Sequence, residues 1–185
     1  MTGTALLLGT TGMLSAAARH AAGLAEKSVI VSRNAGSFSF GDEVLDAKCI
    51  ALPISYEDEP ALLAALEEHA PFDLALTWIR PRAELLRAAL DALVAPGGTL
   101  IEEMGSRSIL AGKNGEPSIA SIRAEALAHQ PDISYAQVVL GFVHENGASR
   151  WLNHEEISAA AIAQMEMPLP RRIAGTLEPW DARPQ

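Results

Sequence analysis

The chain has 185 residues, of which 49% are hydrophobic and 20% charged, so it fits one ordinary globular domain with its own core. A net charge of −9 and the lack of a basic stripe argue against nucleic acid as a partner. The single cysteine, Cys49, excludes an internal disulfide and fits a reducing compartment, and no apolar run is long enough to span a bilayer. We therefore expect a cytoplasmic protein with no signal peptide and no membrane partner.

Short apolar runs alternate with longer helical patterns along the chain. The runs are typical of buried parallel strands and cover residues 5–8, 28–32, 49–52, 72–76, 99–102 and 135–142. The helical patterns cover residues 13–25, 60–69, 81–94, 119–129 and 154–165. This alternation predicts a doubly wound, Rossmann-like α/β fold with a parallel sheet of about six strands in the order 3-2-1-4-5-6. Ligands of such sheets bind at the carboxyl ends of the strands, near the point where the strand order reverses.

The ends of several predicted helices carry recognisable signals. Asp58 marks one helix start. Pro81 marks another, because the N–H that proline lacks would be unsatisfied in the first turn of a helix anyway. Ser118 is a predicted N-cap, and Asn153 with Glu156 has the spacing of a capping box. These signals support the helical segments read from the periodicity.

Three stretches have no regular period. Residues 34–41 and 106–117 are rich in Gly, Ser and Asn and are predicted loops, and residues 167–185 carry several prolines. We expect one domain over residues 1–166 and a proline-rich tail over residues 167–185, which either wraps over the body or a neighbouring subunit or stays loose.

A glycine turn follows the first predicted strand. The apolar run stops at Gly9, Gly12 comes three residues later, and an alanine-rich helix begins at once. Strand, tight glycine turn and helix start form the pattern that binds a dinucleotide pyrophosphate, because the helix N-terminus offers free N–H groups and glycine lets a ligand touch the backbone. A turn that only joins strand to helix is the alternative. The candidate cofactor residues here are Gly9, Thr10, Thr11, Gly12, Met13 and Leu14.

The end of the second predicted strand indicates which dinucleotide is bound. An acidic residue there would accept from the ribose 2′-hydroxyl of NAD, but the chain reads Ser32, Arg33, Asn34. Arg33 can fork onto a 2′-phosphate, with Ser32 and Asn34 as neighbouring donors. The sequence therefore favours NADP(H) over NAD(H); a solvated loop arginine is the alternative.

The next two strand ends add further candidates. Ser55 and Tyr56 follow the third strand, where the adenine would lie, although Tyr56 packing on the following helix is an equal alternative. Thr77 and Trp78 end the fourth strand, where the backbone would pass under the pyrophosphate and Trp78 would line the nicotinamide cleft. A buried core tryptophan is the alternative for Trp78.

Together these residues resemble the short-chain dehydrogenase/reductase superfamily. The run Gly9–Leu14 is similar to that family's glycine turn, with Ser15 or a nearby alanine in place of its third glycine, and the Ser32-Arg33 pair is similar to its NADP-preferring members. The resemblance runs from about Thr4 to Ser106 and, more weakly, through the sixth strand. The chain looks most like compact bacterial members of this superfamily, which implies an NADP(H)-dependent oxidoreductase.

The family's catalytic pair is absent. Its members use a tyrosine with a lysine four residues on, whereas Tyr56 is followed at that spacing by Pro60 and Tyr135 by Val139. Ser106 is the best positional match to the family's catalytic serine. Other candidate groups nearby, each with a purely structural alternative, are Lys113, Glu102 and Glu103.

Two functions from different classes stay open. One is an NADP(H)-dependent reductase of a small carbonyl-type substrate, and the other is a non-catalytic NADP-binding sensor or structural protein. A methyltransferase ranks last, because Ser32-Arg33 supplies no acid for the ribose of S-adenosylmethionine. The acids and histidines at 144–145 and 154–156 match no zinc spacing, so no metal is expected. The substrate and the formation of a homo-oligomer are left open.

Overall fold

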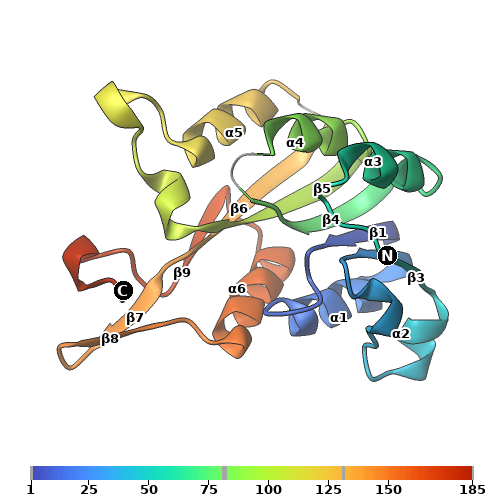
Figure 1. Cartoon of the computed structure of the whole chain (residues 1–185), viewed down its shortest axis with the longest axis horizontal. Coiled ribbons are helices and arrows are strands. Elements are labelled where there is room, and N and C mark those ends of the chain that lie inside the picture. The colour runs from blue at the N-terminus through green and yellow to red at the C-terminus, as the bar shows by residue number, and fades with distance from the viewer. Residues whose placement is uncertain (1, 81–82, 131, 185) are drawn as a thin grey trace.

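The computed structural model describes residues 2–80, 83–130 and 132–184. Its centre is a seven-stranded parallel sheet in the order β3-β2-β1-β4-β5-β6-β9, flanked by helices on both faces (Figure 1). The strands of this sheet are β1 (Thr2–Leu8), β2 (Ala25–Val31), β3 (Cys49–Leu52), β4 (Phe72–Trp78), β5 (Val94–Gly105), β6 (Ser134–Leu140) and β9 (Arg171–Ala174).

The helices form two layers, one on each face of the sheet. One layer holds α1 and α6, with the short α2 beside them, and the other holds α3, α4 and α5 (Figure 1). The helices are α1 (Ser15–Leu24), α2 (Glu43–Ala47), α3 (Glu59–Glu67), α4 (Glu84–Asp91), α5 (Ile119–Ala128) and α6 (His154–Glu166). Short 3-10 segments are η1 (Ala35–Ser37), η2 (Ser106–Ile109), η3 (Lys113–Gly115) and η4 (Trp180–Ala182).

Helix α1 packs closely because its buried face is made of alanines. Ala17, Ala18, Ala21 and Ala22 are fully buried against the sheet and α6. Small side chains let helix and sheet approach, and their burial follows the helical repeat. The N-terminal end of α6 is tied to the same region, because Ser158 Oγ donates to the carbonyl oxygen of Met13 at 2.9 Å. The start of α1 is thereby held over the carboxyl ends of the strands.

The predicted fold class and strand order are confirmed, and so are three predicted helix caps. Asp58 accepts from the N–H of Ala61, Ser118 accepts from the N–H of Ser121, and Asn153 and Glu156 form a reciprocal capping box. The predicted helix start at Pro81 lies outside the described residues, and α4 is described from Glu84.

The predicted strand over residues 135–142 is present as β6, but it ends two residues earlier than predicted. Strand β6 ends at Leu140, and the chain turns at Gly141 into β7 (Phe142–Glu145). A Cβ at Gly141 would lie 2.1 Å from the carbonyl oxygen of Thr176, so the tail passes against the backbone where the strand breaks.

The hairpin of β7 with β8 (Ala148–Trp151) and the strand β9 have no counterpart among the predicted strands. β7 pairs antiparallel with β8 through Asn146-Gly147, both at positive φ, which is a hairpin signal that the sequence carried. β9 lies in the tail, where we expected no regular structure, and it extends the sheet beside β6. No helix in the described ranges combines the length and apolarity needed to cross a membrane.

Candidate functional site

The glycine turn joins the three strands at the middle of the sheet. Gly9 follows β1 with φ of +73°, and its N–H donates to the carbonyl oxygen of Val31 at 2.9 Å. A Cβ at Gly9 would lie 2.6 Å from the carbonyl oxygen of Trp78. Both the positive φ and this close approach require glycine. The turn therefore holds the ends of β1, β2 and β4 together.

Gly12 is a different kind of glycine. It is exposed, its φ is ordinary, and a Cβ there would meet no atom of the described chain within 4 Å. The protein's own packing gives no reason for glycine at this position. Leu14, the N-cap of α1, supplies no side-chain hydrogen bond, so the first N–H groups of that helix have no side-chain cap. This surface can accept an anionic ligand close to the backbone.

A cavity of about 420 Å³ lies beside the turn, and we call it the glycine-turn pocket. Eight of the predicted cofactor residues line it: Gly9, Thr11, Ser32, Arg33, Asn34, Ser55, Tyr56 and Trp78. They come from the carboxyl ends of β1, β2, β3 and β4, as the topology of a doubly wound sheet requires. Sequence positions far apart are therefore brought together at one edge.

Two arginines line the glycine-turn pocket and differ in their partners. Arg80 Nη1 lies 3.0 Å from Glu57 Oε1 in an exposed ion pair. Arg33 is exposed and, among the described residues, has no ion-pair partner. Arg33 is thus the cation of this pocket that can take up an added phosphate.

The other predicted cofactor residues do not line the glycine-turn pocket. Thr10 and Leu14 are fully buried, and Thr10 Oγ1 has no hydrogen-bond partner among the described residues. Thr77 is buried on the α4 side of the sheet and donates to the carbonyl oxygen of Ile101 at 3.5 Å. Gly12 and Met13 lie on the turn itself, outside the pocket lining.

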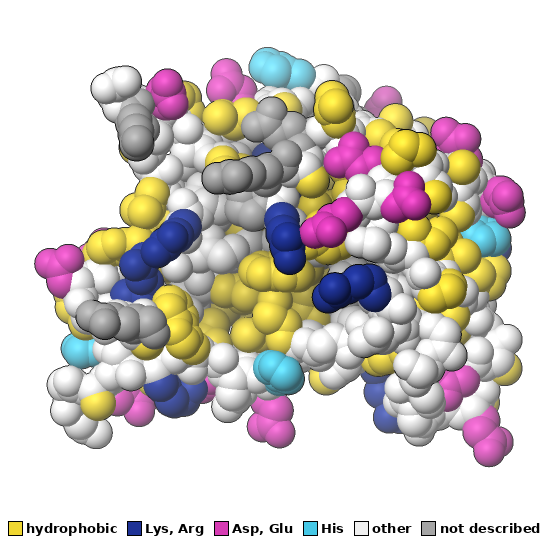
Figure 2. All heavy atoms as spheres, in the orientation of Figure 1, with side chains coloured by type: hydrophobic (Ala, Val, Ile, Leu, Met, Phe, Trp, Pro, Cys, Tyr) yellow, Lys and Arg dark blue, Asp and Glu magenta, His cyan; other side chains and the backbone are white. Residues whose placement is uncertain are grey.

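A second cavity, of about 450 Å³, lies at the ends of β4, β5 and β6, and we call it the β5–β6 pocket. Its apolar lining is Trp78, Leu140, Trp151, Leu152, Ile157 and Pro184. Its polar side chains are Ser106, Arg107 and Arg183. The face seen in Figure 2 is hollowed at its centre, where hydrophobic side chains gather and Lys or Arg side chains flank them.

Trp78 lines both pockets. It ends β4 and lies directly against the glycine turn through its carbonyl oxygen. A ligand that extends from Arg33 past the turn would therefore reach the β5–β6 pocket at Trp78. The two pockets share Trp78 at the carboxyl edge of the sheet.

Ser106 lies where the sequence placed it, directly after β5. Its side chain is 6% exposed and lines the β5–β6 pocket. The side chain of Lys113, another candidate, lies outside the described part of the structure.

Glu102 and Glu103 point to opposite faces of the sheet, as adjacent strand residues must. Glu103 is paired in register with Trp78 and Val138 and lies on the α1–α6 side. It is fully buried, and neither carboxyl oxygen has a hydrogen-bond partner among the described residues. Burial raises the pKa of Glu103 well above its ordinary value, because desolvation disfavours the charged carboxylate.

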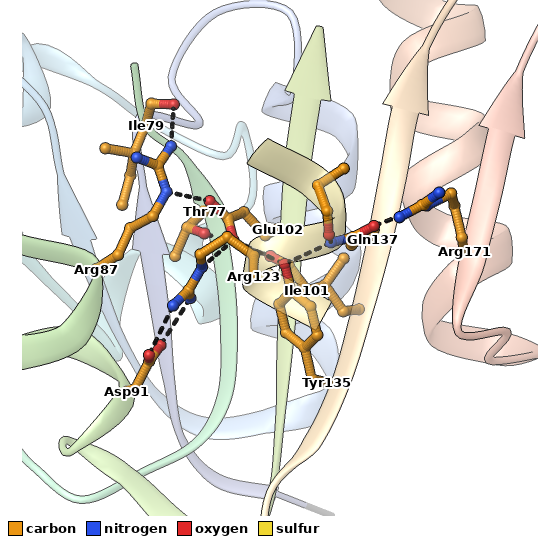
Figure 3. A network of polar contacts seen from close by, with 11 residues as sticks. Thr77, Ile79, Arg87, Asp91, Ile101, Glu102, Arg123, Tyr135, Gln137 and Arg171 are labelled. Atoms are coloured by element: carbon orange, nitrogen blue, oxygen red, sulfur yellow. Dashed lines mark hydrogen bonds and ion pairs between the residues drawn. The ribbon is translucent and has the colours of Figure 1, made fainter. Parts of the chain in front are cut away.

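Glu102 is held in a buried ion network on the other face (Figure 3). Arg87 Nε donates to Glu102 Oε1, and Arg123 Nε donates to Oε2 at 3.1 Å. Arg123 also forms a two-pronged ion pair with Asp91, at 2.8 Å for each contact. Since both carboxylate oxygens of Glu102 are engaged on the face away from Trp78, Glu102 ties α4 and α5 to β5.

Tyr135 belongs to the same network. Its hydroxyl donates to Glu102 Oε2 at 2.9 Å and accepts from Gln137 Nε2 at 3.0 Å (Figure 3). Burial and the nearby Glu102 carboxylate raise the pKa of Tyr135. Tyr56 lines the glycine-turn pocket. Neither Tyr56 nor Tyr135 lines the β5–β6 pocket.

Arg107 and Arg183 are the residues that the sequence analysis missed at this site. Arg107 directly follows the candidate Ser106, and this adjacency was the available signal. Arg183 lies in the tail, and no local pattern places the tail at the pocket. It arrives there because β9 pairs with β6 and Thr176 pairs with Phe142.

Comparison with known proteins addresses the fold. The sequence matches no protein-family model and no curated protein. Among solved structures, a short-chain type dehydrogenase/reductase from Mycobacterium marinum has a TM-score of 0.66 over 96% of this chain and 95% of its own, at 13% identity. This chain has the short-chain dehydrogenase/reductase fold.

Further structures with this fold were solved with dinucleotides. A short chain dehydrogenase from Burkholderia cenocepacia J2315 in complex with NADP has a TM-score of 0.64 at 12% identity and covers 94% of this chain and 96% of its own. BdcA in complex with NADPH has a TM-score of 0.64 at 14% identity, with 95% and 96% covered. The resemblance read from the glycine turn is confirmed at the level of the short-chain dehydrogenase/reductase fold.

Proposed function

We propose that this chain is an NADP(H)-binding member of the short-chain dehydrogenase/reductase superfamily that reduces a small carbonyl compound. The observation that carries the proposal is the junction at Trp78, which lines both the glycine-turn pocket and the β5–β6 pocket. The glycine-turn pocket suits the adenosine half of a dinucleotide, and the β5–β6 pocket receives the nicotinamide end together with a substrate.

The residues at the turn fit a dinucleotide phosphate. Gly12 leaves open space over the backbone that its own fold does not use, and the start of α1 has no side-chain cap. Arg33 stands at the end of β2 without an ion-pair partner among the described residues, where it would receive a 2′-phosphate. The neighbours solved with NADP and NADPH support the same cofactor for this chain.

Ser106 is the group that we assign to the substrate. When bound, the reduced nicotinamide would supply a hydride, that is, a proton with two electrons, to the carbonyl carbon. Ser106 lines the β5–β6 pocket, and its hydroxyl would donate a hydrogen bond to the carbonyl oxygen and orient it. The second proton, which completes the alcohol, comes from water that enters the pocket.

The first test is titration of the purified protein with NADPH and NADH, followed by nicotinamide fluorescence. We expect NADPH to bind at least about tenfold more tightly than NADH. A panel of small aldehydes and ketones then tests for oxidation of bound NADPH, and Ser106→Ala is expected to slow it by about a hundredfold with unchanged NADPH affinity. If neither nucleotide binds, the proposal is wrong.

A non-catalytic NADP-binding sensor is the second candidate, and the positions of the tyrosines favour it. Tyr135 is engaged with Glu102 on the far face, and Tyr56 lies in the glycine-turn pocket. Tight NADPH binding with no turnover across the panel, and no effect of Ser106→Ala on binding, would support this candidate. The single half-buried cysteine and the proposed NADP(H) requirement support a reducing, cytoplasmic location for either function.

A further inference from the structure

The charged side chains that line the β5–β6 pocket are arginines. We propose, resting on the proposed function above, that the substrate carries an oxyanion, a carboxylate or a phosphate, that Arg107 and Arg183 bind. The chain as a whole has 23 acidic against 14 basic residues, yet the described lining of this pocket holds two arginines and no carboxylate. A site with this lining selects anions against neutral molecules of the same shape.

Arg107 is positioned by the end of β5. The short segment η2 begins at Ser106, and Ser108 Oγ donates to the carbonyl oxygen of Gly105 at 2.7 Å. The carbonyl oxygen of Arg107 accepts from the N–H of Leu110 at 3.2 Å. The backbone of Arg107 is therefore held, while its side chain is exposed and has no ion-pair partner among the described residues. Being next to Ser106, it places a cation beside the expected carbonyl group.

Arg183 reaches the pocket through the ordered tail. After β9, Thr176 exchanges two backbone hydrogen bonds with Phe142, at 2.8 and 2.9 Å. The hydroxyl of Thr176 then donates to the carbonyl oxygen of Glu178 at 2.9 Å. These contacts lead the chain into η4, directly before Arg183. The tail thus contributes a side chain to the candidate substrate site.

The guanidinium of Arg183 is held by an aromatic ring. Its Cζ lies 4.4 Å from the centroid of the Trp180 ring. Stacking on a ring uses the flat face of a guanidinium and leaves its N–H edge available for a carboxylate or phosphate. A cation that is fixed in this way loses little side-chain entropy when it binds an oxyanion.

The buried carboxyl group beside the pocket does not oppose an anion. Glu103 lies two residues before Gly105, a lining residue, and in register with Trp78 on the same face of the sheet. Burial without a hydrogen-bond partner among the described residues raises the pKa of Glu103 and so disfavours a negative charge at this place. The apolar walls of Leu140 and Ile157 strengthen the attraction between the arginines and an oxyanion.

The tryptophans supply a signal that does not need the cofactor. Trp78 and Trp151 line the pocket, and Trp180 stacks on Arg183, which accounts for all three tryptophans of the chain. Intrinsic fluorescence of the protein without nucleotide therefore reports on ligands in this pocket. Two matched pairs of probes test the charge: 2-oxobutanoate against its methyl ester, and dihydroxyacetone phosphate against dihydroxyacetone.

We expect at least one anion to change the fluorescence saturably and to bind at least about tenfold more tightly than its neutral counterpart. Arg107→Gln and Arg183→Gln should each weaken that anion about tenfold or more, and the double variant should remove the difference between the pair. Arg19→Gln is the control, because this substitution removes the same charge from a residue of α1 that lines neither pocket. Comparison of the carboxylate and phosphate pairs identifies the kind of oxyanion.

Equal binding of charged and neutral probes, binding of no anion, or an unchanged double variant would each overturn the proposal. Circular dichroism of each variant checks that it is folded. NADPH titration of the same samples separates the two proposals: NADPH binding without anion binding rejects the oxyanion site alone. Anion binding without NADPH binding rejects the proposed reductase and leaves the oxyanion site standing.

Discussion

A methyl group placed on Gly9 would lie 2.6 Å from the carbonyl oxygen of Trp78. This approach ties the turn after β1 to the end of β4, where the glycine-turn pocket and the β5–β6 pocket meet. The geometry of the whole candidate site therefore depends on a contact that only glycine permits.

Gly9→Ala should destabilise the fold by about 2–4 kcal/mol, because it combines a positive φ with a clash against backbone. Urea unfolding measures this change. Gly12→Ala is the matched comparison, since its Cβ meets no protein atom and its φ is ordinary. We expect its stability to stay within about 0.5 kcal/mol of the parent while NADPH affinity falls at least about tenfold. Unchanged NADPH binding by Gly12→Ala would show that this turn is architecture only.

Arg33→Gln should weaken NADPH about tenfold to a hundredfold and leave NADH nearly unchanged, because a charged hydrogen bond to the 2′-phosphate is lost. Fluorescence titration at two salt concentrations measures both affinities, and the parent protein should lose its preference as salt rises. Arg80→Gln serves as a comparison in the same pocket, since Glu57 already pairs with Arg80. An equal loss for both nucleotides would count against a 2′-phosphate contact.

The buried Glu103 should make stability fall as pH rises. The pKa of Glu103 is raised in the folded state. The contribution of this group to the unfolding free energy is therefore fully present below its unfolded-state pKa and is lost as pH rises through its folded-state pKa. Between these two pKa values the unfolding free energy falls by up to about 1.4 kcal/mol per pH unit. Glu103→Met should flatten the profile of unfolding free energy and be the more stable protein at about pH 8. Glu67→Met, at an exposed position on α3, should change the profile little. Parallel profiles for the parent and Glu103→Met would contradict this prediction.

Glu102→Gln should cost about 3–5 kcal/mol of unfolding free energy, because it removes the buried carboxylate that both Arg87 and Arg123 contact. Arg123 keeps its ion pair with Asp91 in this variant. Glu125→Gln, on the exposed face of α5, is the control and should stay within about 0.5 kcal/mol of the parent. NADPH affinity, measured where both proteins are folded, should be unchanged, since Glu102 lines neither pocket.

Most of the lining of the glycine-turn pocket could be predicted from the sequence because its signals are local. The glycine turn, the first helix and the strand ends at Ser32 and Ser55 each follow a short apolar run. Parallel strands place all their carboxyl ends on one edge, so knowledge of the strand order was enough to bring eight of the candidate residues to one pocket.

The lining of the β5–β6 pocket was decided by tertiary structure. β9 exists only because residues 171–174 find the free edge of β6, more than 30 residues away in the chain, and Arg183 follows from that pairing. Prolines around it hid this strand from any local pattern.

The two adjacent glutamates of β5 show the same division. The sequence by itself placed Glu102 and Glu103 at the end of the fifth predicted strand, and adjacent side chains along a strand lie on opposite faces. It could not determine their chemistry, which depends on what packs on each face. Helices α4 and α5 bring Arg87 and Arg123 to the two carboxyl oxygens of Glu102. The α1–α6 face offers Glu103 no counter-charge among the described residues, so desolvation raises its pKa.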